Sequence, residues 1–248
     1  MLNLIKAEMF KLRKNKLCYF GIILALFPLV LSFLFTTGSD TFSIFGRYDL
    51  LSYVNGNFST IILGTGVYFV FFSMVINSVV SNEINSDVVI YEIVGKGKKI
   101  KLFFSKLITL LMLFSIILFL VFLFTILGYE LFLTHTTHIQ NSHAFYEPGN
   151  FIYSIFYYYG VLIIFTALSF LGLNNGLVIG SFIFNLLSLK LCTINFLAPF
   201  LIGGPVYANY DLYHKNYGSF LMSQYVLLVV TVGLFLYFSF QHFNKRDF

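Results

Sequence analysis

Charged side chains are scarce in this chain. Asp, Glu, Lys and Arg together make up 10% of its 248 residues, whereas a water-soluble domain carries about 25% charged residues. Hydrophobic residues make up 58% of the chain, and the mean hydropathy is +0.87. This balance excludes an ordinary soluble domain and indicates a protein embedded in lipid.

Residue patterns that support chemistry are also missing. The sequence has no Gly-x-x-x-x-Gly-Lys-Ser/Thr phosphate-binding loop and no identifiable Ser–His–Asp or Cys–His arrangement. Its apolar runs lack the carboxylates that mark ion-coupled transporters. The histidines and acidic residues between 129 and 150 match no zinc signature, so we expect a solvated loop there. These residues are His135, His138, His143, Glu130 and Glu147. We therefore expect no enzyme activity and no cofactor or metal bound by this chain.

Long apolar runs are what the chain does contain. Each run is close to the length of about 20 residues that a helix needs to cross a hydrocarbon core of about 30 Å. Barrel strands are shorter and alternate in polarity, so these runs predict helices. The sequence predicts an all-α membrane protein with a single transmembrane domain, residues 1–248, and six transmembrane helices. The predicted spans are 17–36, 59–80, 107–128, 151–172, 177–191 and 219–240.

Basic residues are distributed unevenly between the two predicted sides. Twelve of the 15 Lys and Arg residues lie near the N-terminus, in the segment 81–106 or near the C-terminus. Cytoplasmic loops carry such an excess, so both termini and the 81–106 loop are predicted to be cytoplasmic. The positive charge then faces lipid headgroups, and we expect no nucleic-acid partner. Cys18 and Cys192 would lie at opposite ends of the protein, too far apart to form a disulfide.

The first 16 residues precede the first predicted span. Leu2, Ile5, Met9 and Leu12 recur at helical spacing, which predicts an N-terminal helix, residues 1–16, lying in the inner membrane interface. The alternative is a basic tail that only sets the orientation of the chain.

The 81–106 loop begins as an amphipathic helix and continues as a basic turn that contains glycines. Glu83 and Asp87 lie four residues apart, where like charges repel by a few tenths of a kcal/mol. A partner that carries Lys or Arg would relieve this repulsion. An ordinary solvated helix face is the alternative. The apolar residues Val80, Ile84, Val88 and Tyr91 share another side of this helix.

Other local signals concern the spans themselves. Pro28 predicts a kink in the first span. Gly176 and Gly180, with Gly172 before them, form a small-residue face that predicts a possible dimer interface. Residues 192–218 are apolar but interrupted, which predicts an outer re-entrant hairpin. The tyrosines of the fourth span predict an aromatic belt at the membrane surface. They are Tyr153, Tyr157, Tyr158 and Tyr159.

The order of these features resembles the membrane subunit of ABC exporters of the type-2 permease family, of the small kind found with peptide and bacteriocin transporters. The resemblance covers essentially the whole chain. It rests on three elements, of which the last is the apolar hairpin before the final span. The first two are Lys6-Ala7-Glu8-x-x-Lys11-Leu12-Arg13-Lys14 and Glu83-x-x-Ser86-Asp87, the latter followed by a basic stretch and Lys106. The family motif has Gly-Thr where this chain has Ser86-Asp87.

The resemblance implies a coupling helix in the 81–106 loop that docks on a separate ABC ATPase subunit through Glu83, Ser86, Asp87 and Tyr91. It implies that this ATPase binds ATP and Mg, and that a second permease chain, identical or similar, completes the transporter. The transporter would export hydrophobic or amphipathic peptides, such as toxin or antimicrobial peptides, across a bacterial cell membrane. The alternatives are a bacteriocin-immunity or sensory membrane protein that binds peptide without sustained transport, and a membrane enzyme or assembly factor.

Overall fold

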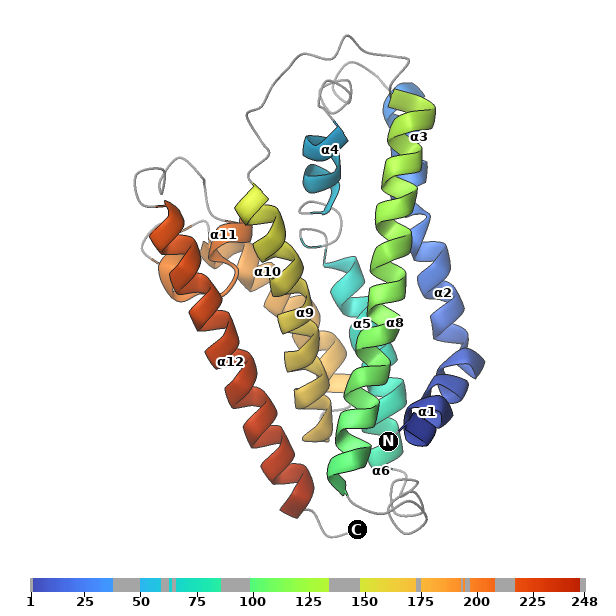
Figure 1. The fold of residues 1–248 in the computed structure, drawn as a ribbon, viewed down its shortest axis with the longest axis vertical. Coiled ribbons are helices and arrows are strands. Elements are labelled where there is room, and N and C mark those ends of the chain that lie inside the picture. Colours follow the sequence, from blue (N-terminus) through green and yellow to red (C-terminus); the bar gives the residue numbers. More distant parts are fainter. Residues whose placement is uncertain are drawn as a thin grey trace.

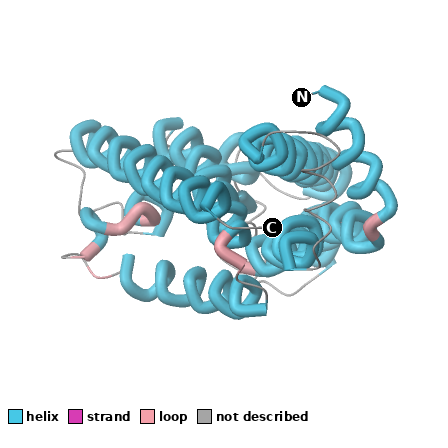
Figure 2. Tube along the Cα trace, turned by 90° about the horizontal axis from the view of Figure 1, so that it is seen from below, coloured by secondary structure: helices cyan, strands magenta, loops and turns pink. Residues whose placement is uncertain are grey.

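The computed structural model describes residues 2–37, 50–58, 63, 66–85, 99–133, 148–172, 175–192, 194, 197–207 and 217–245. Throughout these residues the chain forms helices joined by turns and loops, with no strand (Figure 2). The all-α prediction is confirmed for this part of the chain.

Five helical segments are long and apolar enough to cross a membrane, and the protein is therefore membrane-spanning. They overlap the first four predicted spans and the sixth, although the second segment begins at Val67, eight residues after the predicted start. The fifth predicted span is an 18-residue helix, about 27 Å long at 1.5 Å per residue, slightly less than a core of about 30 Å. The sixth crossing stays a prediction. The five segments are Lys16–Leu34, Val67–Ile84, Lys99–Phe132, Gly149–Phe170 and Gly218–Lys245.

The helices run mainly along the long axis of the molecule (Figure 1). In chain order they are α1 (Leu2–Lys14), α2 (Lys16–Ala25), α3 (Phe27–Thr37), α4 (Leu50–Asn57), α5 (Val67–Ile76), the π-helix η3 (Asn77–Ser81), α6 (Asn82–Asn85), α8 (Lys99–Gly128), the π-helix η4 (Tyr129–Leu133), α9 (Pro148–Phe170), α10 (Asn175–Cys192), the 3₁₀ helix η6 (Ala198–Phe200), α11 (Gly204–Tyr207) and α12 (Tyr217–Lys245).

Both ends of the described chain lie at the same end of the bundle. Helix α1, α6 and the last turn of α12 are at the bottom of Figure 1. Lys99, the first residue of α8, donates a hydrogen bond from Nζ to the backbone oxygen of Asn244 over 3.1 Å. That this end faces the cytoplasm stays a prediction.

Helices α5 and α9 form the centre of the bundle, and α12 and α2 are the most exposed of the spanning segments. Aromatic rings fill this centre, with centroids 4.4 Å apart for Phe72 and Phe114. Tyr153, Tyr157 and Tyr158 are at most 1% exposed, so the prediction that these tyrosines form a belt at the membrane surface is wrong. Their phenol rings pack in the core because their side of α9 faces α5 and α12.

The N-terminal helix forms as predicted, but a different face of it is buried. Leu4, Glu8 and Leu12 recur every fourth residue and face the bundle, whereas Leu2 is 75% exposed. The buried stripe therefore includes a carboxylate, and the hydrophobic spacing read from the sequence did not identify it.

The predicted kink in the first span is confirmed as a break between α2 and α3 at Leu26. Pro28 has no N–H to donate to the carbonyl of Leu24, four residues earlier. The hydroxyl of Tyr68 on α5 donates to that carbonyl instead, over 3.0 Å. The carbonyl left unpaired at the break is thus bonded by a side chain of a neighbouring helix. Within lipid every backbone polar group needs such a partner inside the protein.

Replacing Tyr68 with Phe is expected to lower the free energy of unfolding by about 1–3 kcal/mol, because the partly buried carbonyl of Leu24 loses its side-chain donor. In a Pro28→Ala background the same change should cost less, since an alanine N–H at position 28 can donate to that carbonyl. Thermal unfolding in mild detergent measures both. An equal cost in the two backgrounds would show that Tyr68 does not replace the missing proline donor.

Side chains of two helices of the bundle hold part of the segment that follows α10. Tyr153 of α9 donates a hydrogen bond from its hydroxyl to the backbone oxygen of Ile202. Gln224 of α12 donates from Nε2 to the backbone oxygen of Pro199 over 2.8 Å. The described part of the predicted hairpin therefore consists of the short helices η6 and α11 packed on α9 and α12. Re-entry into the membrane stays a prediction.

Candidate functional site

Four charged side chains of alternating sign meet where α1, α6 and α8 converge. Glu8 and Lys11 lie three residues apart on α1, which places them on neighbouring positions of its surface. Glu83 lies in α6, directly after the π-helix η3, and Lys106 lies in the third turn of α8. We call Glu8, Lys11, Glu83 and Lys106 the charge ring.

Each member of the charge ring contacts both members of opposite charge. Lys11 Nζ lies 3.2 Å from Glu8 Oε1 and 3.0 Å from Glu83 Oε1. Lys106 Nζ lies 3.1 Å from Glu8 Oε2 and is also paired with Glu83 Oε2. The four ion pairs close a ring in which two ammonium groups neutralise two carboxylates.

The ring extends from the protein interior to its surface. The side chains of Glu8 and Lys106 are fully buried, that of Glu83 is 17% exposed and that of Lys11 is 33% exposed. A buried ion loses several kcal/mol of hydration, which only well-placed partners can offset. Lys106 has a third acceptor, the backbone oxygen of Val79 in the π-helix η3, 3.2 Å from Nζ. Glu8 and Lys106 are therefore held as ions by contacts from three separate segments.

Apolar packing and a helix cap position these charges. Leu4 and Leu12 lie one turn before and one turn after Glu8 and are buried with it on the face of α1 that contacts α8. Asn15 directly follows the last residue of α1. Its side-chain oxygen caps α2 by accepting a hydrogen bond from the N–H of Leu17 over 3.0 Å. The amide of Asn15 also donates to Ser78 of η3 over 2.8 Å. The junction between α1 and α2 is thereby tied to η3, the π-helix that directly precedes α6 and Glu83.

The arrangement acts as a joint between three parts of the chain rather than as an open binding site. It connects α1 and α8 through groups 98 residues apart in sequence. It also fixes α6, the first turn of the 81–106 loop, to both of them. A displacement of α6 away from α1 or α8 would stretch the ion pair of Glu83 with Lys11 or with Lys106.

Of the four predicted docking residues, the structure describes only Glu83. Glu83 belongs to the charge ring, so the basic groups expected from another protein are supplied here by Lys11 and Lys106 of this chain. Ser86, Asp87 and Tyr91 lie outside the described residues. Docking of a partner on this loop stays a prediction, with Glu83 placed at its base.

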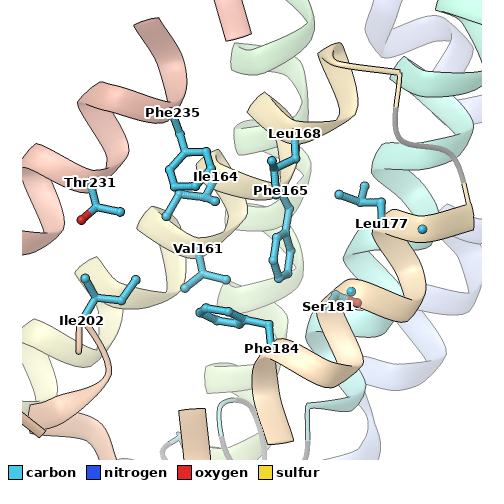
Figure 3. A pocket seen from close by; sticks show the side chains of 12 residues that line it. Val161, Ile164, Phe165, Leu168, Leu177, Ser181, Phe184, Ile202, Thr231 and Phe235 are labelled. Carbon is cyan, nitrogen blue, oxygen red and sulfur yellow. The ribbon is translucent and has the colours of Figure 1, made fainter. Parts of the chain in front are cut away.

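A second feature is an apolar cavity of about 320 Å³ between α9, α10 and α12. Gly176 and Gly180 line it, and a Cβ built on either would meet no atom within 4 Å. The rings of Phe165 and Phe184 lie side by side in its wall (Figure 3), in an edge-to-face contact with centroids 5.8 Å apart. Gly172 is not part of this face, since it has φ +84° in the turn after α9. Whether a second copy covers Gly176 and Gly180 stays a prediction.

The sequence contained a signal for the charge ring that the hydropathy pattern concealed. Lys106 is followed directly by a long apolar run, and Glu8 lies between Leu4 and Leu12 at a spacing of four. An ionisable group surrounded by apolar residues at a span is expected to have a charged partner. Which acid pairs with Lys106 follows only from how α1 folds back on α8.

The histidines predicted to form a solvated loop, His135, His138 and His143, lie outside the described residues.

Comparison with protein-family models, with curated proteins and with solved structures finds no match to this chain. The charge ring and the apolar cavity are therefore the observations on which a function rests.

Proposed function

We propose that this chain is the membrane subunit of an ATP-driven exporter of hydrophobic or amphipathic peptides in a bacterial cell membrane. A separate ATPase docks beneath the 81–106 loop and binds ATP and Mg, and a second permease chain completes the transporter. The observation that carries the proposal is the charge ring, which fastens the start of this loop to α1 and α8.

The ring gives the loop the mechanical connection that such a partner would need. A ligand or partner shifts a conformational equilibrium only through groups that it contacts differently in the two states. An ATPase that moves the loop would move α6, and the ion pairs would carry that movement to α8, a helix of 30 residues. A loop attached by a flexible connection could not transmit it. The docking contact itself is assigned to Asp87 and its neighbours, because Glu83 is occupied within the chain.

The proposed docking predicts that Asp87→Lys abolishes recovery of the ATPase. The tagged chain is isolated from its native membranes in mild detergent, and bound proteins are identified by mass spectrometry. Reversing one charge at an interface costs several kcal/mol, so recovery should fall by about tenfold or more. The matched control is Asp211→Lys, which makes the same change in the segment predicted to face outward. An ATPase that is absent from the wild-type sample, or is retained by Asp87→Lys, would contradict docking at this loop.

Transport is distinguished from passive peptide binding by a second measurement. The chain and the recovered ATPase are reconstituted in lipid vesicles, and ATP hydrolysis is measured with and without an amphipathic peptide. An exporter should hydrolyse ATP faster with peptide, whereas an immunity or sensory protein should bind peptide at a constant rate of hydrolysis.

A further inference from the structure

The apolar cavity borders the middle of α12. Thr231 and Phe235 line it from α12, and Thr231 is the middle residue of the 29-residue helix Tyr217–Lys245. At a rise of 1.5 Å per residue, Thr231 lies about 20 Å from either end of that helix. Half of a hydrocarbon core is about 15 Å thick. The wall of the cavity on α12 is therefore at the depth of the ends of lipid acyl chains, while Leu168 and Gly176 extend the cavity toward the turn between α9 and α10.

The side chains that line the cavity offer no hydrogen-bond donor to a ligand. Its two hydroxyl groups donate within their own helices, Ser181 to the backbone oxygen of Val178 over 2.8 Å and Thr231 to that of Leu227 over 2.7 Å. The other lining residues are aliphatic, aromatic or glycine. A polar ligand would lose its hydration here and gain no donor from these side chains.

The rim of the cavity is apolar as well. On α10, Gly176 and Gly180 are exposed, and so is Ile179, which is 61% exposed. On α12, Leu234 and Phe238 lie beside the lining residues at helical spacing and are 51% and 62% exposed. Contact of a surface of this composition with the hydrocarbon of lipid is more favourable than contact with water.

We infer that this cavity holds the methyl end of a membrane lipid acyl chain. A single chain is one methylene group wide and can lie against Gly176 and Gly180, where the missing side chains leave room. A helix of a second copy is about 10–12 Å across with its side chains and suits a shallow groove better than this cavity. The inference needs only that the helices span a membrane, so it does not depend on the exporter proposal.

The absence of Trp from the sequence provides a direct test. In one variant Phe184→Trp introduces the only Trp at the cavity wall, and in a second Phe182→Trp introduces it on the outer face of α10, where the side chain is 51% exposed. Each full-length variant is reconstituted in phosphatidylcholine vesicles whose acyl chains carry bromine near the methyl end or near the headgroup. Bromine quenches Trp fluorescence on contact.

Bromine near the methyl end is expected to quench the Phe184→Trp variant more strongly than bromine near the headgroup. Adding Gly180→Leu should fill the cavity and reduce this quenching by about twofold or more, because a close-packed interior leaves no room for the chain. The Phe182→Trp variant should be unaffected by Gly180→Leu, which also shows that the protein remains folded.

Two results would overturn the inference. One is a Phe184→Trp variant that is not quenched while Phe182→Trp is, which would mean that protein occupies or closes the cavity. If raising the ratio of lipid to protein then restores quenching, the occupant is a second copy of the chain. The other is quenching of Phe184→Trp that Gly180→Leu leaves unchanged, since the lipid would then contact the reporter outside the cavity.

Discussion

Lys106→Met is expected to lower the free energy of unfolding by about 3–5 kcal/mol, because removing one partner of a buried ion pair leaves the other charge uncompensated. Met nearly preserves the volume of the Lys side chain, so the effect comes from charge rather than from a cavity. In the variant, the fully buried carboxylate of Glu8 retains only Lys11, which must also neutralise Glu83. The charge ring changes from neutral to a net charge of −1.

The measurement is thermal unfolding of the purified chain in mild detergent, followed by circular dichroism. Lys101→Met is the matched control, because Lys101 is exposed on the same helix and its replacement should change stability by less than about 0.5 kcal/mol. Adding Glu8→Gln to Lys106→Met should restore part of the loss, since the remaining Lys11 and Glu83 again balance. If the two changes were simply additive, the buried charges would not be coupled as the ring requires.

Gly128→Ala is expected to destabilise the protein by about 2–5 kcal/mol through overpacking and a lost hydrogen bond. A Cβ at position 128 would overlap Ser32 Oγ and lie 2.8 Å from Ser32 Cβ. The Ser32 hydroxyl is buried and lies 2.7 Å from the hydroxyl of Tyr53. A methyl group here therefore pushes α3 away from α8 and separates Ser32 from Tyr53.

Gly233→Ala provides the control for Gly128→Ala, because a Cβ at position 233 would meet no atom within 4 Å. Glycine in a helix interior is less stable than alanine by about 0.5–1 kcal/mol, so this control should be neutral or slightly stabilising. Combining Ser32→Gly with Gly128→Ala should recover part of the loss by removing the overlap. A melting temperature of Gly128→Ala equal to that of Gly233→Ala would show that α3 and α8 are not in close contact at this point.

Most of the helical segments could be predicted from hydropathy. A bilayer offers no hydrogen-bond partners to the backbone, so a run of apolar residues must form a helix wherever it crosses. This constraint is local. Five predicted spans overlap long apolar helices, although the second was predicted to begin eight residues before Val67, and the break in the first lies near Pro28. Length alone leaves open whether α10 crosses the membrane, since its 18 residues lie near the shortest length of a spanning helix.

The charge ring could be predicted only in part. The sequence showed that Glu83 needed a basic partner, but it did not show that Lys11 and Lys106 of the same chain provide it. Glu8 was missed because the spacing of Leu2, Ile5 and Met9 favoured a different face of α1. The face that is buried depends on where α1 lies against α8, which is a tertiary contact.

The glycines illustrate the same distinction. Gly128, Gly176 and Gly180 look alike in the sequence, each within or beside an apolar run. Gly128 touches Ser32 of α3, so a side chain there would clash. Gly176 and Gly180 border an open apolar cavity, so a side chain there would fill space.

The sequence by itself determined that this protein is helical and membrane-spanning, and roughly where its helices begin and end. These properties follow from the free energy of transferring each segment from water to lipid, which depends on the residues of that segment alone. Only the tertiary structure decided that Glu8, Lys11, Glu83 and Lys106 form one neutral ring and that α9, α10 and α12 enclose a cavity. Ion pairs and cavities depend on distances of a few ångströms between helices far apart in the chain, and packing sets those distances.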